Sequence, residues 1–126
     1  MQNPHPLLVH FPIAFLIAFA LATLLALVVR RPGLAAFARA CLFVGTAAAA
    51  VTVLSGFLAE QSVAPVARAR PDIEDHRLFG YGVLSLSGLL TALAVIAPRH
   101  AARAGLVRAA QSVGSLVLLV VLWLTA

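Results

Sequence analysis

Charge is scarce in this 126-residue sequence, and lysine is missing altogether. Only 10% of the residues are charged, 63% are hydrophobic, and all nine basic residues are arginine. The mean hydropathy of +1.06 is far above that of an ordinary soluble domain. A water-soluble core of this size could not hide so much apolar surface. The arginines are scattered between apolar segments, which argues against a basic face for nucleic acid.

Cysteine occurs once, as Cys41, so the chain can form no internal disulfide and has no CxxC motif. We interpret Cys41 as a small buried apolar residue. The motifs of metalloproteases, nucleophile elbows, phosphate loops and dinucleotide sites are absent as well, and no serine has a histidine at a spacing that suggests a base. An electron carrier or a metal-binding protein is therefore expected rather than a classical enzyme.

Long apolar segments are what the sequence has in abundance. A helix needs about 20 mostly apolar residues to cross a bilayer, and four segments meet that length: residues 6–29, 34–59, 76–97 and 105–125. Charges and helix breakers separate them. The fold class predicted is all-α: an integral membrane four-helix bundle that forms a single transmembrane domain over residues 1–126.

The arginines predict the orientation of this bundle. Six of them lie in or beside the first and third loops: Arg30, Arg31, Arg39, Arg99, Arg103 and Arg108. The second loop carries three arginines together with all four acidic residues of the chain. Because cytoplasmic loops are enriched in arginine, we expect the second loop and both termini to be extracytoplasmic.

Ionisable side chains at the membrane are costly and often functional, and four of them share the predicted outer side. His5 and His10 begin the first segment, Glu60 ends the second, and His76 begins the third. His10 lies about one turn beyond Pro6, and His76 about one turn beyond Asp72. We therefore expect the two imidazoles to lie at the same level and to face each other across the bundle.

Small residues lie one helical turn inward from these polar groups. Ala14 follows His10, Gly80 follows His76, and Gly56 precedes Glu60, each on the same helix face as its polar neighbour. This spacing would leave space beneath the polar groups. Pro12 lacks an N–H, and it is expected to leave the Leu8 carbonyl without its usual helical donor.

The polar cluster is compatible with three interpretations. A haem needs two imidazoles on different helices and a slot where glycine admits the macrocycle, which His10, His76 and Gly80 would supply. A divalent ion such as Zn²⁺ or Cu²⁺ accepts imidazole and carboxylate together, which His5, His10, Glu60 and His76 would supply. Alternatively, the histidines cap helices and hydrogen-bond the loops.

The opening segment His5-Pro6-Leu7-Leu8-Val9-His10-Phe11-Pro12-Ile13-Ala14 resembles the signature of DUF2231, a family of small bacterial membrane proteins with a four-helix layout. Gly56-Phe57-Leu58 and His76 are similar to later landmarks of that family. Many members begin with His-Pro-x-His-Pro, whereas this chain has Gln2-Asn3-Pro4-His5-Pro6, so the first histidine of that pattern is absent. An acidic residue usual late in the first span is also missing, with Thr23 near that place.

The resemblance implies a multi-pass protein of the bacterial inner membrane. Some family members are fused to Rieske iron–sulfur domains, which implies an electron-transfer setting and a Rieske-type redox partner. The leading hypothesis is a cytochrome b-like electron carrier with haem b between His10 and His76. The second is a Zn- or Cu-binding membrane protein that uses the same cluster, and the third is a structural or interaction subunit without a cofactor. Small-residue faces of the second and third spans are candidates for a homodimer contact.

Overall fold

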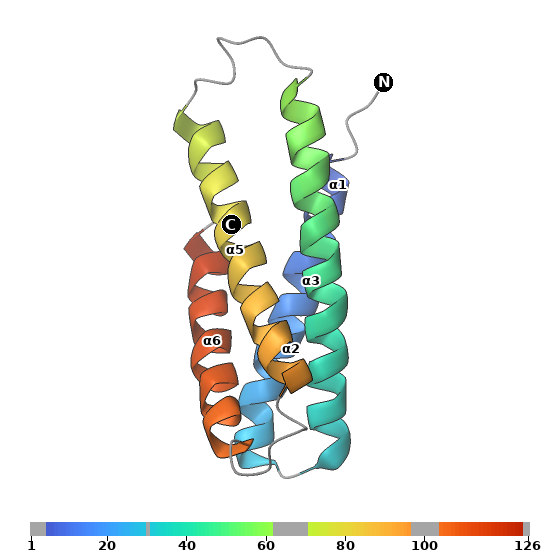
Figure 1. The fold of residues 1–126 in the computed structure, drawn as a ribbon, viewed down its shortest axis with the longest axis vertical. Helices are drawn as coiled ribbons and strands as arrows, with labels where there is room; N and C mark the ends of the chain where they lie inside the picture. The colour runs from blue at the N-terminus through green and yellow to red at the C-terminus, as the bar shows by residue number, and fades with distance from the viewer. Residues whose placement is uncertain (1–4, 30, 62–70, 97–103, 125–126) are drawn as a thin grey trace.

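The computed structural model describes residues 5–29, 31–61, 71–96 and 104–124, and nearly all of them are helical (Figure 1). A short helix, α1, is followed by four long ones. Their bounds are α1 His5–Leu8, α2 His10–Val28, α3 Pro32–Gln61, α5 Pro71–Ile96 and α6 Ala104–Leu124. The four-helix prediction is confirmed, with the first segment divided at Val9.

The long helices run alternately down and up, so each is antiparallel to the next (Figure 1). Helix α2 packs against α3 and α6, and α5 packs against the same two, which closes a ring of four helices. Helix α1 continues α2 outward and packs against α3. One end of the bundle therefore holds the start of α1, the end of α3 and the start of α5; we name it the outer end, and the opposite one the inner end.

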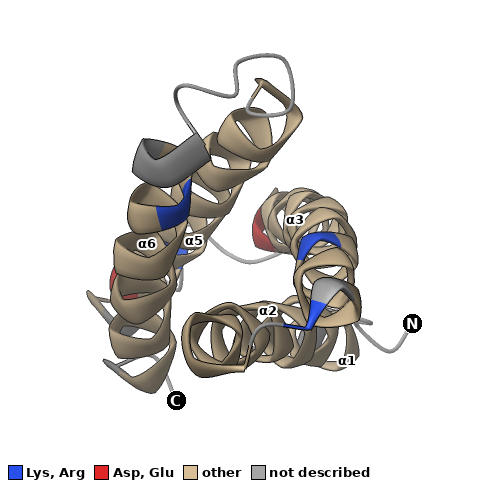
Figure 2. Ribbon diagram, turned by 90° about the horizontal axis from the view of Figure 1, so that it is seen from below, with Lys and Arg blue, Asp and Glu red and all other residues tan. Residues whose placement is uncertain are grey.

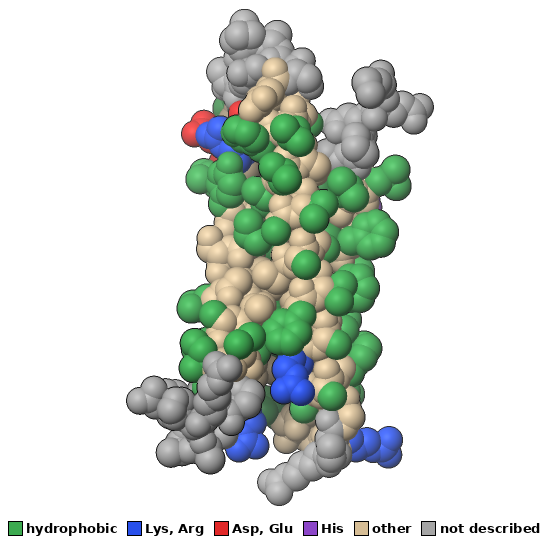
Figure 3. All heavy atoms as spheres, turned by 45° about the vertical axis from the view of Figure 1, so that its right-hand side comes forward, with side chains coloured by type: hydrophobic (Ala, Val, Ile, Leu, Met, Phe, Trp, Pro, Cys, Tyr) green, Lys and Arg blue, Asp and Glu red, His purple; other side chains and the backbone are tan. Residues whose placement is uncertain are grey.

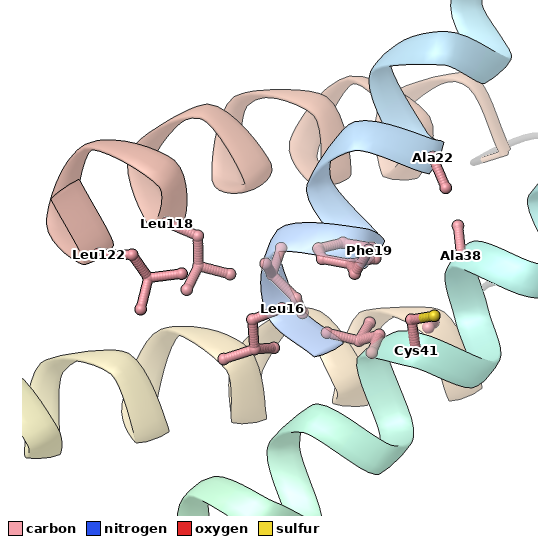
Figure 4. Close-up of a cluster of buried hydrophobic side chains, with 10 residues drawn as sticks. Leu16, Phe19, Ala22, Ala38, Cys41, Leu118 and Leu122 are labelled. Carbon is pink, nitrogen blue, oxygen red and sulfur yellow. The ribbon is translucent and has the colours of Figure 1, made fainter. Parts of the chain in front are cut away.

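The interior of the ring is mostly apolar, although Ser87 and Ser115 are also fully buried. Leu16, Phe19, Leu42 and Leu118 are almost completely buried and belong to one cluster (Figure 4). The same cluster includes Cys41, which is buried as predicted. Aliphatic and aromatic side chains carry no hydrogen-bonding groups, so burying them leaves no donor or acceptor unpaired.

Glycine lets two pairs of helices approach closely. A Cβ added at Gly45 of α3 would lie 2.8 Å from Leu16 Cδ2 and 3.3 Å from the Leu16 backbone nitrogen. A Cβ at Gly114 of α6 would lie 2.6 Å from Leu90 Cδ2. The space that these glycines leave is already occupied by leucines from α2 and α5, as expected for small residues at membrane helix contacts.

The outer surface of the bundle also exposes many apolar side chains. Large hydrophobic side chains are exposed on every long helix and cover the middle of the molecule, while charged side chains lie toward its two ends (Figure 3). Among the described residues, three helices are long and apolar enough to cross a membrane: residues 10–28, 33–61 and 73–96. Helix α6 contributes a shorter apolar stretch, Val107–Trp123. An exposed apolar belt between charged ends is typical of a bilayer-spanning protein.

Candidate functional site

The outer end of the bundle is the candidate site, and an ion pair fastens two of its helices. Arg77 Nη1 on α5 donates to Glu60 Oε1 on α3 across 3.3 Å. Glu60 is half-buried and Arg77 is exposed. The end of α3 and the start of α5 are therefore brought together, as the sequence predicted for Glu60 and His76.

His76 heads the inward-facing stripe of α5. Positions three or four residues apart share a helix face, and this stripe continues through half-buried Gly80 to Ser87 and Leu90, which are both buried. The prediction that Gly80 lies one turn below His76 on the same face is confirmed. The imidazole itself is exposed, because it lies beyond the part of α5 that the other helices surround.

His10 lies on an exposed face of α2, in contrast to the inward-facing stripe of α5. The buried residues of α2 include Leu16, Phe19 and Ala20, whereas His10 and Ala14 are exposed, as is Leu21 further along the same side. This stripe points away from the interior of the bundle. The space predicted beneath His10 at Ala14 therefore opens outward and not into a slot between helices.

The depths of His10 and His76 along the bundle can be compared through α3, because α3 contacts both α1 and α5. Thr52 Oγ1 donates to the Leu8 carbonyl oxygen across 3.1 Å, so the end of α1 is level with Thr52. A Cβ at Gly80 of α5 would lie 3.8 Å from Val53 Cγ2 of α3, so Gly80 is level with Val53. Thr52 and Val53 are adjacent in α3, so Leu8 and Gly80 lie at nearly the same level.

The two histidines consequently lie at different levels. His10 is two residues further inward than Leu8, and His76 is four residues further outward than Gly80. Adding these steps to the one between Thr52 and Val53 separates the histidines by about 10 Å along the helices. His76 therefore lies further outward than His10, because α5 extends further outward than α2. A haem held by these two histidines stays a prediction.

The metal-ligand hypothesis depends partly on residues that the structure does not describe. Among the described residues, no three His, Cys, Asp or Glu side chains are grouped as metal ligands. The side chain of His5 lies outside the described set, so a site that includes it stays a prediction. Glu60 has a guanidinium as its neighbour, which disfavours a second cation at the same carboxylate. Gly56 is half-buried, one turn inward from Glu60.

A comparison with protein families decides the affiliation of the chain. The sequence model of DUF2231, described as a predicted membrane protein, matches residues 2–126. The chain belongs to the DUF2231 family. No curated protein and no solved structure matches it.

Two contacts of this DUF2231 chain were not anticipated from its sequence. In the sequence, Arg77 contributes only to the prediction of topology. Its position one residue after His76, across the loop from Glu60, could have indicated the ion pair with Glu60. The hydroxyls of Thr46 and Thr91 are hydrogen-bonded at 3.0 Å between α3 and α5. Each threonine lies near the middle of an apolar segment, where a hydroxyl commonly finds a partner on a neighbouring helix.

Proposed function

We propose that this chain is a membrane-embedded interaction subunit that binds a partner with a basic surface at its outer end. The observation that carries the proposal is the unequal reach of the helices. The outer parts of α3 and α5 continue beyond α2 and α6 and present acidic side chains. We name this projecting pair, residues 54–61 and 71–79, the outer hairpin.

The length of the outer hairpin follows from the contacts along α5 and α3. Gly114 of α6 is level with Leu90 of α5, so the end of α6 at Leu124 is level with Gly80. Helix α5 continues outward for nine more residues, which is about 13 Å. Helix α3 continues past the level of His10 by a comparable distance.

The charge of the outer hairpin favours a basic partner. Glu74 and Asp75 are exposed on α5, while Arg77 is engaged by Glu60. The described part of the hairpin therefore carries two exposed carboxylates that its ion pair does not neutralise. Complementary charge steers association and selects partners more than it adds affinity.

The orientation of the chain supports an extracytoplasmic partner. The described arginines other than Arg77 lie toward the opposite end of the bundle, on or just before α3 and on α6 (Figure 2). With that end in the cytoplasm, the outer hairpin faces the extracytoplasmic side of a bacterial inner membrane. A Rieske-type protein or another redox protein with a basic face is a partner of the expected kind.

Site-specific photo-crosslinking in native membranes tests this function. A photoreactive residue at Leu78 of the outer hairpin is compared with one at Leu21 of α2, since the two leucines are similarly exposed, at 60% and 57%. We expect a discrete protein adduct from Leu78 and none from Leu21. The adduct from Leu78 should weaken when Glu74→Gln and Asp75→Asn are combined.

Three results would contradict the proposal. The first is an identical adduct pattern at both positions, or no protein adduct at Leu78. The second is an adduct of twice the chain mass, because a second copy would bring the same acidic surface. The third is a Soret band or stoichiometric zinc or copper in the purified protein that disappears with His10→Ala or His76→Ala, which would favour the cofactor hypotheses instead.

A further inference from the structure

An apolar hollow lies at the inner end of the bundle, far from the outer hairpin. It has a volume of about 460 Å³ and lies where the end of α2 meets the start of α3. Its lining is formed by Leu25, Val29, Arg31, Gly33, Leu34 and Phe37. The hollow is open to its surroundings, and its volume is within the range of small-molecule sites.

The hollow exists because of a glycine and a tight connection. Arg31 N donates to the Val29 carbonyl oxygen at 2.8 Å, and Leu34 N donates to the Arg31 carbonyl oxygen at 3.0 Å. These bonds fix the turn between α2 and α3. A Cβ at Gly33 would meet nothing within 4 Å, so the absent side chain leaves free space at this point.

The chemistry of the lining combines an apolar wall with one cation. Leu25, Leu34 and Phe37 present hydrocarbon, and exposed Arg31 is the charged residue of the lining. The start of α3 adds the partial positive charge of a helix amino terminus. All four acidic residues of the chain lie between Glu60 and Asp75, near the other end, so none of them offsets this charge.

We propose that the hollow is a binding site for an anionic phospholipid. One acyl chain would lie along Leu25, Leu34 and Phe37, and the headgroup phosphate would pair with Arg31. Complementary charge selects this occupant, since basic pockets between membrane helices on the cytoplasmic side suit anionic headgroups. Arginine can bind a phosphate through two parallel hydrogen bonds.

Native mass spectrometry of the detergent-solubilised chain tests this site. Phosphatidylglycerol and phosphatidylcholine with the same acyl chains are titrated separately. We expect tighter binding of phosphatidylglycerol, and we expect Arg31→Gln to weaken it about fivefold, as the loss of one arginine near an anionic headgroup predicts. Binding of phosphatidylcholine should change little in that variant.

Two further variants separate the hollow from general basic charge. Arg39→Gln removes the same charge eight residues further along the chain, but Arg39 does not line the hollow, so it should leave phosphatidylglycerol binding unchanged. Gly33→Leu fills the hollow and should weaken binding of both lipids while leaving the melting temperature unchanged. Equal affinity of the parent for both lipids, or equal losses in Arg31→Gln and Arg39→Gln, would overturn the proposal. So would a Gly33→Leu variant that folds and binds both lipids like the parent.

Discussion

Pro12 and Thr52 form a small compensating pair at the outer end. Because Pro12 has no N–H, the Leu8 carbonyl loses the donor that an uninterrupted helix would supply, as its sequence position predicted. Thr52 of α3 donates in its place. The sequence identified the carbonyl that would lack a donor, but only the packing of α1 against α3 could identify the residue that supplies one.

Replacement of that donor should loosen the outer end. We expect Thr52→Val to lower the free energy of unfolding by about 0.6 kcal/mol, and by no more than about 1.7 kcal/mol, the range found for hydrogen bonds between membrane helices. Thr52→Ser, which keeps the hydroxyl, should retain most of the stability. Equilibrium unfolding in mixed micelles measures both, and equal losses in the two variants would contradict the hydrogen-bond explanation.

Added volume at Gly45 should lower the free energy of unfolding. Gly45→Ala places a methyl against the side chain and backbone of Leu16, and overpacking of this kind destabilises by about 1–3 kcal/mol. Gly82→Ala is the matched control, because a Cβ there meets nothing within 4 Å. The same unfolding measurement should rank Gly45→Ala well below Gly82→Ala, and equal stability of the two would show that the α2–α3 contact can relax.

At the scale of the helices, the four segments were predictable because each is long, apolar and bounded by charges or helix breakers. Their ends were less accurate. The third segment was expected from residue 76, whereas α5 begins at Pro71. Proline is favoured in the first helical turn, and the charged residues that follow it are expected outside the hydrocarbon. Hydropathy predicts the part of a helix that lies in the membrane and not the whole length of the helix.

Two of the polar contacts between helices α3 and α5 should contribute unequally to stability. The Thr46–Thr91 hydrogen bond is half-buried, whereas the Glu60–Arg77 pair lies at an exposed end. We expect Arg77→Gln to lower stability by less than about 1 kcal/mol. The loss should shrink as salt is added, and chemical unfolding at low and high ionic strength measures it. A loss that is large and independent of salt would mean that the pair is more buried than its exposure indicates.

At the scale of the whole molecule, topology predicted that the polar residues lie at one end of the bundle. It could not predict how close to one another their side chains lie. An even number of alternating helices returns Glu60, His76 and the start of the chain to one end. Hydropathy places each residue only relative to its own helix. The shift of α2 against α5, and the outward face of His10, arise from side-chain packing between helices that no single segment encodes.

The proposed membrane orientation predicts the behaviour of carboxyl-terminal fusions. With the arginine-rich end in the cytoplasm, alkaline phosphatase fused after Ala126 should be active, and green fluorescent protein at the same place should be dark. Replacement of Arg31, Arg39 and Arg108 by glutamine should weaken this preference. Fluorescence of the carboxyl-terminal fusion in the parent chain would contradict this orientation and would show that the outer hairpin lies in the cytoplasm.

Because α2 and α3 differ in length, the bilayer thickness should determine how far the outer hairpin extends from the membrane. Helix α2 has 19 residues and α3 has 30, which corresponds to about 28 Å and about 45 Å, against a hydrocarbon layer of about 30 Å. Lipids with short chains should leave Glu74 and Asp75 standing clear of the headgroups, while long chains should draw them toward the surface. Hydrophobic mismatch of this kind would adjust how much of the acidic tip a partner can reach.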